Sequence, residues 1–351
     1  MASLVLSDEN GAKSNMKAAR LHSILDTAAR KRVLVIGDLM LDEFVWGKVG
    51  RISPEAPVPI VEVTGESFYP GGAANVARNL REFLGQVSVA GIFGTDSSGR
   101  RLRELLFTQD IDIRDAIEDP QFPTIVKTRI IARQQQVVRV DREQVRAPSA
   151  AQVAMVVERV RKALSQIDAI IFEDYGKGFL TAELVREICD VALTAGKIVS
   201  ADPNPRHALA WKNVTVVKPN RAEAFLAAGA AWADPIDSPQ NDEALRKVGA
   251  ALLEKWDTKL VLITLGEQGM MLFQKASEPH HIPTKARQVF DVSGAGDTAI
   301  ALLTLALAAG ASPIEAAEIA NHGSAVVVGK LGTATVTRKE LVASFEDDAR
   351  N

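Results

Sequence analysis

The sequence predicts an α/β fold: a three-layer sandwich with helices on both faces of a mostly parallel central sheet, plus a small β lid. Three observations lead to this prediction. Between residues 150 and 264, apolar runs of strand length alternate with runs of helical spacing, which is typical of a parallel sheet covered on both faces. Two other segments alternate apolar and polar residues with a period of two, as strands outside the main sheet do. No repeat or low-complexity linker divides the chain, so we expect one domain over residues 14–351.

The composition is that of an ordinary soluble globular protein, with 47% apolar and 24% charged residues in a chain of 351. A net charge of −3 disfavours nucleic acid or a membrane surface as the main partner. The one cysteine, Cys189, cannot form an internal disulfide. Because the N-terminus carries no secretory signal, we expect a cytoplasmic protein. The apolar run at residues 299–309 is too short to span a bilayer and predicts a buried helix.

The chain begins with a polar stretch, residues 1–13, which we expect to be disordered. Helical spacing over residues 16–30 leads into an apolar run at 33–38, which predicts the first buried strand. No G-x-G-x-x-G motif follows this strand, and its absence argues against a dinucleotide site. The pattern then predicts a helix, a strand and a second helix at residues 70–84, 87–92 and 98–107.

The β lid is expected from about residues 43–64 and 124–143. The first segment holds three prolines, Pro54, Pro57 and Pro59, which restrict strands to sheet edges. The second alternates Val, Thr and Ile with charged side chains. A small amphipathic sheet of this kind covers a site or pairs with another copy of itself. We therefore expect a lid that also forms a homodimer.

After the lid, regular alternation resumes. It predicts helices at 150–164, 182–193, 222–228 and 242–256, and strands at 169–172, 198–201, 214–217 and 260–264. The stretches at 270–273 and 281–282 leave no room for helices, so this edge of the sheet should be antiparallel. Two helices, at 313–328 and 338–345, close the chain. In such folds, ligands bind at the carboxyl ends of the strands.

Polar clusters stand at these strand ends, and their chemistry is that of a phosphate site. They begin at Asp38, Glu173, Asp202, Lys218 and Thr264. Each cluster alone fits helix caps and turns, but the fold brings all of them to one rim. Carboxylates and glycine loops together favour hydroxyl groups and Mg²⁺-bound phosphates as ligands. One cysteine excludes a metal-thiolate site, and the five histidines lack ligand spacing; the pair at 280–281 fits an exposed strand edge.

The loop at residues 291–298 comes between a strand-like segment at 289–290 and the apolar run. Gly294 and Gly296 permit backbone angles closed to other residues and let a ligand approach the main chain. The first amides of the following helix have no intrahelical partner, which suits phosphate. Asp297 is unexpected beside an anion site, unless it takes a proton from an attacking hydroxyl. For the isolated loop, an aspartate in a helix's first turn is an equally good interpretation.

Taken together, these motifs resemble those of the ribokinase-like (PfkB) sugar kinases, over nearly the whole chain from residue 33. The Gly-Gly…Asn element is residues 71–75, the Asn-x-x-Glu motif is 220–223, and the C-terminal signature is 291–297. The chain departs from the family in three ways. The first element is one residue shorter than in many members, Val292 replaces the usual threonine, and Ala301 stands where glycine is common. None of these removes a chemical group that the reaction needs.

The resemblance implies roles for individual residues. Asp297 would be the base that deprotonates the acceptor hydroxyl, and the anion hole would comprise the amides of Gly294, Ala295 and Gly296. Glu223, with Asn220, would organise Mg²⁺ and the ATP phosphates through water. The nucleotide site would be lined by Thr264, Gly266 and Gly269, with Asn321 near the adenine. The sugar hydroxyls would be held by Asp38, Asp42, Gly71, Gly72 and Asn75. A monovalent cation (K⁺) near the Asp291 loop is common in the family.

Four stretches, 37–42, 50–59, 70–77 and 292–298, resemble the subgroup that phosphorylates D-glycero-β-D-manno-heptose 7-phosphate at C1. In many bacteria this kinase is fused to a nucleotidyltransferase with a His-x-Gly-His motif, which this sequence lacks. The resemblance thus implies a stand-alone kinase on the route to ADP-heptose and lipopolysaccharide core. The substrate phosphate needs cations, for which the candidates are Arg51, Lys127, Arg133, Arg139, Arg142 and Lys177. We select Lys177 and Arg133, although for any one of the six a solvated charge on the lid is the simpler interpretation.

Two alternatives stay open. Within the same class, the chain could phosphorylate an unphosphorylated sugar or a nucleoside, because the same aspartates and glycines serve either substrate. In a different class, a nucleotide-binding sensor or regulator would keep the glycine loop and the lid without turnover. Asp297 argues against the sensor, since a protein that only binds nucleotide has no use for a base beside the phosphate.

Overall fold

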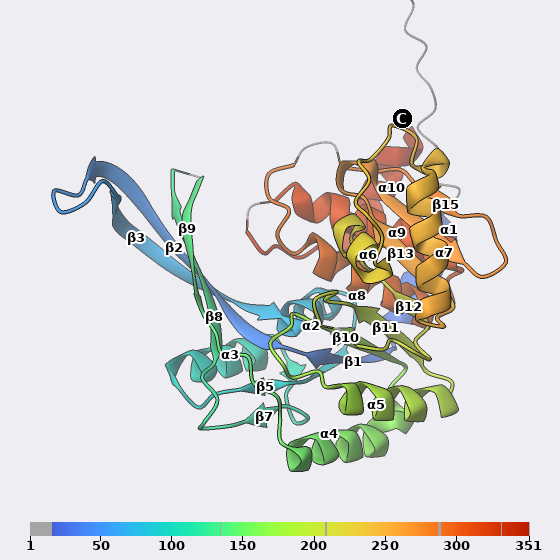
Figure 1. Cartoon of the computed structure of the whole chain (residues 1–351), viewed down its shortest axis with the longest axis horizontal. Helices are drawn as coiled ribbons and strands as arrows, with labels where there is room; N and C mark the ends of the chain where they lie inside the picture. Colours follow the sequence, from blue (N-terminus) through green and yellow to red (C-terminus); the bar gives the residue numbers. More distant parts are fainter. Residues whose placement is uncertain (1–15, 134, 208, 287–288, 331, 351) are drawn as a thin grey trace, which may run out of the picture.

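The computed structural model describes residues 16–133, 135–207, 209–286, 289–330 and 332–350. Within them, nine strands form the central sheet in the order β15-β14-β13-β12-β11-β10-β1-β4-β6 (Figure 1). Neighbouring strands from β6 to β13 are parallel, whereas β14 and β15 are antiparallel to their neighbours. The bounds are β1 Arg32–Gly37, β4 Gln86–Ala90, β6 Ile111–Asp112, β10 Ala169–Glu173, β11 Ile198–Asp202, β12 Val216–Val217, β13 Leu260–Thr264, β14 Met270–Gln274 and β15 His280–Ile282.

Helices cover both faces of this sheet because successive strand residues point to opposite sides. On β1, Val33 and Val35 join the core cluster of one face, while Leu34 and Ile36 join that of the other. The first face is covered by α1 Ala18–Ala28, α2 Ala73–Arg81, α3 Ser97–Thr108, α8 Ala295–Ala308, α9 Pro313–Val328 and α10 Arg338–Arg350. The second is covered by α4 Ala150–Ala163, α5 Ala182–Thr194, α6 Arg221–Ala228 and α7 Glu243–Lys255. The three-layer α/β prediction is confirmed, as is the antiparallel edge.

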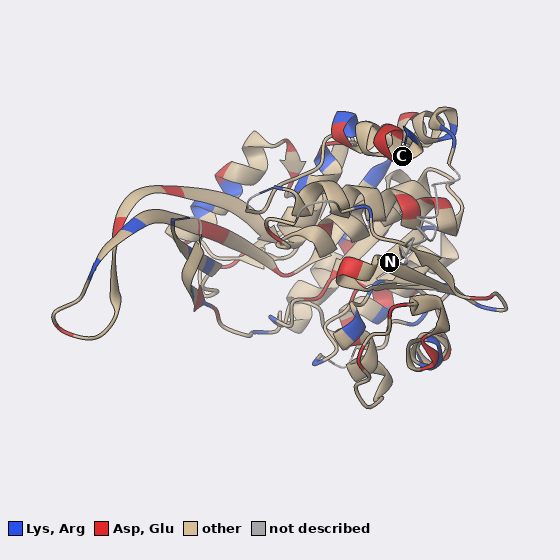
Figure 2. Cartoon of the chain, turned by 90° about the horizontal axis from the view of Figure 1, so that it is seen from above, with Lys and Arg blue, Asp and Glu red and all other residues tan. Residues whose placement is uncertain are grey.

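A second sheet of four strands projects from the body as an arm (Figures 1 and 2). Its order is β3-β2-β8-β9, with bounds β2 Leu39–Ile52, β3 Pro59–Gly72, β8 Ile125–Ala132 and β9 Gln135–Arg142. We call it the lid sheet. Strands β2 and β3 are longer than the alternating pattern indicated, because only Asp38 separates the end of β1 from the start of β2. The first three residues of β2 are buried in the core, whereas its far end is exposed.

Other elements also differ from the predictions. Residues 289–290 are not a strand; Phe290 is exposed and its N–H donates to the carbonyl of Val328 at 2.7 Å. Three short strands went unpredicted as separate elements, β6 and the pair β5 Ile92–Phe93 and β7 Ile117–Glu118. They are two residues long, too short for any periodicity to register. The disorder expected at residues 1–13 falls outside the described residues. Among the described residues, no helix is long and apolar enough to span a membrane.

Candidate active site

The loop before α8 ends in a left-handed glycine and opens a helix N-terminus towards a cavity. Gly294 is the N-cap of α8, with φ of 82°, which only glycine adopts without strain. The Asp291 carboxylate fixes the loop by accepting the N–H of Ser293 at 2.9 Å and that of Gly332 at 3.2 Å. The amides in the first turn of α8 have no intrahelical acceptor, although that of Ala295 makes a long 3.3 Å bond to the Val292 carbonyl. This terminus has the geometry of an anion site.

Asp297 lies in the first turn of α8 and is only 9% exposed. Its Oδ2 accepts the amide N–H of Asn75 at 2.6 Å, and its Oδ1 accepts the hydroxyl of Tyr175 at 2.7 Å. Burial raises the pKa of Asp297, and these two hydrogen bonds act in the opposite direction. The result is a carboxylate held in one orientation with a raised basicity, which is what a general base requires.

Three charged residues from neighbouring strand ends stand beside this turn. Lys218 is 3% exposed, and its Nζ lies 2.7 Å from Oδ2 of Asp202. A Cβ placed on Gly296 would lie 3.6 Å from that same Nζ, so the ammonium faces the helix N-terminus. Burial raises the pKa of Asp202 to about 7. Burial, together with Asp202 and Asp297, also raises the pKa of Glu173 well above its usual value.

A cavity of about 880 Å³ opens from these strand ends. Its lining includes Asn220, Glu223, Thr264 and Gly266 from the predicted nucleotide site, together with Gly296. Asn220 and Glu223 form a capping box at the start of α6, with bonds of 2.8 and 2.9 Å between side chains and amides. The capping box gives these two residues a structural role. Their position on the wall also leaves oxygen ligands near the helix N-terminus, as a metal-bound phosphate requires.

A second cavity, of about 440 Å³, lies between the lid sheet and the same loop. It is lined by Phe44 and Trp46 of β2, by Arg129 of β8 and Arg133 directly after it, and by Asp291, Ser293 and Gly332. Val292 and Gly296 line the first cavity instead. The loop at residues 291–296 therefore separates two cavities, and Asp297 follows directly after it.

The glycines at the base of the lid sheet bring Asp42 close to the main chain. A Cβ on Gly71 would lie 2.5 Å from Oδ2 of Asp42, and Gly72 has φ of 60°. Asp42 is buried and forms an ion pair of 2.5 Å with Arg129, which also stacks on Phe44 at 5.2 Å from the ring centre. A larger residue at position 71 would displace this carboxylate.

Comparison with known proteins identifies the class. The family model described as "pfkB family carbohydrate kinase" matches residues 30–340. The chain belongs to the PfkB family of carbohydrate kinases. It is a sugar kinase, a phosphotransferase with an alcohol group as acceptor, as the motifs predicted.

Relatives and solved structures agree with this assignment. The chain is 42% identical over 333 residues to "Bifunctional protein HldE" of Desulfatibacillum aliphaticivorans, covering 95% of this chain and 67% of the relative. For the protein of the same name from Geobacter sulfurreducens, identity is 41% over 330 residues, covering 94% and 66%. The chain thus spans about two thirds of the length of these relatives.

The solved structure of Arabidopsis thaliana ribokinase with ribose and ATP superposes with a TM-score of 0.68 at 18% identity, covering 90% of this chain and 99% of the other. Escherichia coli phosphofructokinase-2 with substrates and products gives 0.73 at 20% identity, covering 92% and 100%. Both confirm the ribokinase-like fold.

In this PfkB kinase, three residues predicted to bind ligands make contacts that stabilise the fold. The Asp38 carboxylate is 2% exposed and accepts the backbone N–H groups of residues 175, 177 and 179, so it fixes a loop; its contact with a sugar hydroxyl stays a prediction. Gly269 has φ of 89°, and a Cβ there would lie 2.1 Å from the carbonyl of Ile282. Asn321 is buried and donates to the carbonyl of Pro283 at 2.7 Å. Neither Gly269 nor Asn321 lines the 880 Å³ cavity.

The selected cations differ in their surroundings. Lys177 forms an ion pair of 2.7 Å with Glu143, whereas Arg133 is exposed at the end of β8 and lines the lid cavity. Arg129, which is directed inward beside Asp42, is not among the cations predicted from the sequence. Nor does the sequence predict a role for Tyr175 or Lys218. Lys218 could have been found, because it stands two residues before the Asn-x-x-Glu motif at a predicted strand end.

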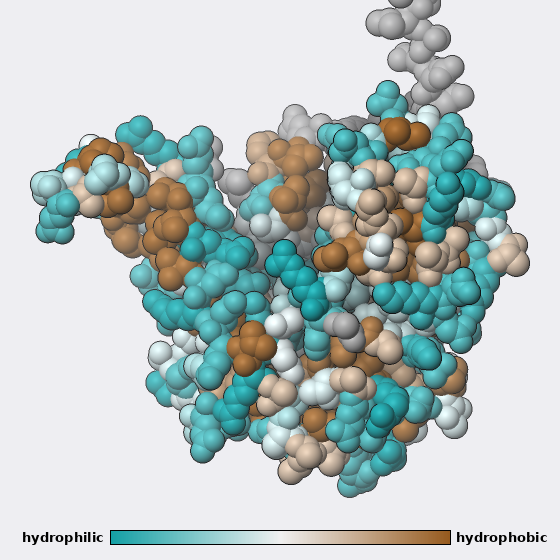
Figure 3. All heavy atoms as spheres, viewed as in Figure 1, coloured by the Kyte–Doolittle hydropathy of each residue, from teal (hydrophilic) through white to brown (hydrophobic). Residues whose placement is uncertain are grey.

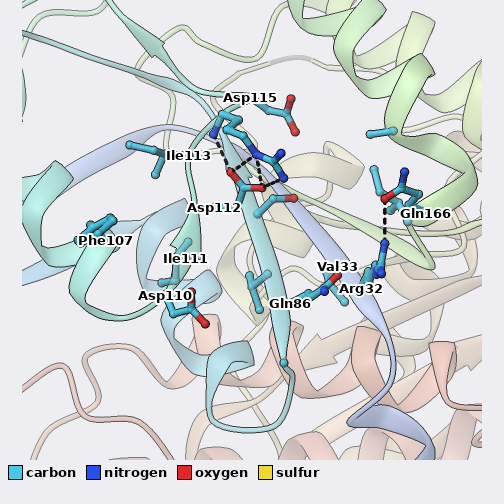
Figure 4. A pocket seen from close by; sticks show the side chains of 16 residues that line it. Arg32, Val33, Gln86, Phe107, Asp110, Ile111, Asp112, Ile113, Asp115 and Gln166 are labelled. Carbon is cyan, nitrogen blue, oxygen red and sulfur yellow. Dashed lines mark hydrogen bonds and ion pairs between the residues drawn. The ribbon is translucent and has the colours of Figure 1, made fainter.

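A further cavity of about 800 Å³ lies at the amino ends of the strands, where β1, β4 and β6 begin (Figure 4). Arg32 there donates to Gln166 at 2.9 Å, and Arg114 forms an ion pair with Asp112. Both arginines are thus already engaged by neighbouring side chains. In the described part of the chain, no group of three or more His, Cys, Asp or Glu residues could hold a metal ion.

Proposed function

We propose that this kinase transfers the γ-phosphoryl group of ATP to the C1 hydroxyl of D-glycero-β-D-manno-heptose 7-phosphate, giving the 1,7-bisphosphate. The observation that carries the proposal is the loop at residues 291–296, with one cavity on each side and Asp297 at its end. A donor phosphate in one cavity and an acceptor hydroxyl in the other would meet there. Transfer then needs a base beside the acceptor and positive charge around the phosphate.

The larger cavity is assigned to ATP. Mg²⁺, when bound with ATP, neutralises charge that develops on the transferred group. Glu223 and Asn220 would hold this ion through water, and Thr264 and Gly266 would line the nucleotide. Lys218 would contact the transferred phosphate, since its ammonium faces the N-terminus of α8. The amides of Gly294, Ala295 and Gly296 would bind the same oxygens.

Asp297 is assigned as the base, and Asn75 fixes its orientation through the 2.6 Å hydrogen bond. Burial raises its pKa, which makes it a better proton acceptor than an exposed aspartate. Asp42, with Gly71 and Gly72 packed against it, would bind a sugar hydroxyl beside Arg129, which lines the lid cavity.

A phosphorylated acceptor fits the cations that line or border the lid cavity. Arg129 and Arg133 line it, while Lys127 lies two residues before Arg129 on β8 and Lys177 lies in the loop after β10. Guanidinium groups bind phosphate through two parallel hydrogen bonds. An unphosphorylated sugar would make no use of this group of cations, which favours the heptose phosphate over the rival substrates.

We also propose a homodimer formed through the lid sheet. Its strands and connecting turn expose apolar side chains on the projecting arm (Figure 3): Ile52, Val58, Val63, Val137, Val138 and Val140. Such a patch favours contact with a second copy of this chain.

A monovalent cation near the Asp291 loop is proposed too, since the structural neighbour phosphofructokinase-2 was solved "in complex with Potassium".

One experiment tests the substrate. A panel of sugars and sugar phosphates, including heptose 7-phosphate, fructose 6-phosphate, ribose and a nucleoside, is assayed with Mg-ATP. We expect the highest kcat/KM with heptose 7-phosphate, and NMR should locate the new phosphate on C1. A higher kcat/KM for an unphosphorylated sugar would refute the proposal. A product of this kind in the cytoplasm would supply ADP-heptose and lipopolysaccharide core synthesis.

A further inference from the structure

Tyr175 lies in the loop that follows β10 and reaches the carboxylate proposed as the base. Its hydroxyl donates to Oδ1 of Asp297 at 2.7 Å. Asn75 occupies the other oxygen, Oδ2. Each carboxylate oxygen can accept more than one hydrogen bond, so an acceptor hydroxyl can still approach while both donors hold the group in place.

We propose that Tyr175 is a positioning residue for Asp297, whose hydroxyl holds the carboxylate in the orientation from which it takes the proton of the acceptor. This inference rests on the proposed role of Asp297. Asn75 alone would restrain rotation about the Cβ–Cγ bond by one hydrogen bond, which tolerates a wider range of orientations than two. With two donors from different elements, α2 and the loop after β10, both oxygens are fixed.

The backbone around Tyr175 is itself held rigidly. Its N–H donates to Oδ2 of Asp38 at 3.0 Å, and the N–H groups of Lys177 and Phe179 donate to the same carboxylate. Gly176, with φ of 68°, makes the turn. The buried Asp38 therefore holds the loop that directs the phenol of Tyr175 towards Asp297. Through this loop, Asp38 acts on the base indirectly.

The ring of Tyr175 also touches the lid sheet. The ammonium of Lys127, on β8, lies 5.0 Å from the ring centre, within the range of a cation–π contact. Tyr175 thus lies between a charged residue of the lid sheet and the carboxylate of α8. A movement of the lid sheet would therefore be transmitted to Asp297 through the ring of Tyr175.

The charges facing Asp297 come from several elements. Lys218 after β12 favours the ionised carboxylate, whereas Asp42 on β2 opposes it. Glu173 and Asp202, at the ends of β10 and β11, are raised in pKa by burial and by the charge of Asp297 among other neighbours. Tyr175 adds a neutral donor to this set, because burial raises the pKa of its phenol well above the usual value. It therefore stays protonated and stabilises the ionised form of Asp297.

The test is Tyr175→Phe, with kcat/KM measured against pH using Mg-ATP and the substrate that the wild-type protein turns over fastest in the panel. Loss of a hydrogen bond to a charged group should move the acidic limb up by about one to two pH units. It should also lower kcat at the optimum by roughly tenfold or more, with the KM for ATP unchanged. An acidic limb at the wild-type position would overturn the inference.

Controls separate this effect from packing. Tyr69→Phe makes the same change at the chain's other tyrosine, which packs edge-on against Phe44, and its acidic limb should stay in place. If Tyr175→Phe does not fold, difluorotyrosine incorporated into the Tyr69→Phe protein labels Tyr175 alone. A more acidic phenol donates a stronger hydrogen bond, so the limb should move down; no movement would overturn the inference.

The outcome is distinguishable from failure of the proposed function. If Asp297→Asn is inactive and Tyr175→Phe keeps the wild-type profile, only the positioning role fails. If Asp297→Asn is active, the base is misassigned and both proposals fail. A different preferred substrate in the panel refutes the heptose assignment and leaves the test of Tyr175 intact, since any substrate that is turned over reports the profile.

Discussion

Replacing Lys218 by methionine tests whether the buried charges of the site are held in balance by this ammonium. Lys218 is 3% exposed and lies 2.7 Å from Asp202. Methionine keeps the length and volume of the side chain and removes the charge. Asp202, whose side chain is 19% exposed, would then be a largely buried carboxylate without its cation, close to Glu173 and Asp297.

The size of the effect follows from the burial of the pair. Removing one partner of a buried ion pair costs about 3–5 kcal/mol, because the remaining charge stays desolvated. The cost should depend on pH. The pKa of Asp202 is already raised to about 7, and loss of Lys218 raises it further. The folded state then binds a proton that the unfolded state has released, so stability falls as pH rises above the unfolded value near 4.

Urea unfolding at pH 5 and pH 8 measures this. We expect Lys218→Met to lose most of its stability at pH 8 and little at pH 5. Adding Asp202→Asn should restore stability at pH 8 without restoring activity, since the phosphate would still lack its cation. Lys275→Met is the matched control, because its ion pair with Asp257 is more than half exposed and should contribute about 0–1 kcal/mol. Equal stability of wild type and Lys218→Met at pH 8 would refute the reasoning.

Three further predictions follow from the structure. Alanine at both Lys177 and Arg133 should raise the KM for the sugar phosphate by roughly tenfold or more and leave that for ATP unchanged; an unchanged sugar constant in steady-state kinetics would reject these two cations. His322 is buried, stacks on Phe345 at 3.7 Å, and has a pKa lowered by burial to about 4. The folded state therefore binds fewer protons than the unfolded state between pH 4 and 6.5, and this residue should destabilise the protein by about 2 kcal/mol on going from pH 7.5 to 5. His322→Gln should remove that part of the acid sensitivity, and an unchanged pH dependence of urea unfolding would contradict the assignment. Gly294→Ala places a side chain at φ of 82° and should lower stability by about 1–2 kcal/mol and turnover with it; thermal unfolding and kcat check both, and a wild-type kcat would argue against an anion hole at this turn.

The order of helices and strands could be predicted because the residues that each element buries are apolar and recur with the period of that element. The strand at Leu260–Thr264 and the helix at Pro313–Val328 have the predicted bounds, since each is apolar on the residues that the sheet or helix buries. Two large apolar residues in succession at 289–290 suggest burial in a strand. They are exposed in the described structure, and no local pattern distinguishes an apolar loop from a strand of two residues.

The site was predictable in part, for a physical reason. Motifs close in sequence fix a loop, so Asp297 and its glycines could be identified as a unit. Contacts between distant strand ends could not be read in the same way. Asp38 and Asp42 are four residues apart and chemically identical, yet the first holds three backbone N–H groups and the second faces Arg129. The hydrogen bond between Tyr175 and Asp297 joins residues 122 positions apart, and only the folded chain reveals it.

The central claim is that Asp297 is the base for phosphoryl transfer at the meeting point of two cavities. Asp297→Asn keeps the shape of the side chain and removes the proton acceptor. Binding of Mg²⁺ with a non-hydrolysable ATP analogue, measured by calorimetry, should keep its Kd, while kcat with Mg-ATP and heptose 7-phosphate should fall by about 10²–10⁴-fold. Retention of most of the wild-type kcat, with nucleotide binding intact, would contradict the account.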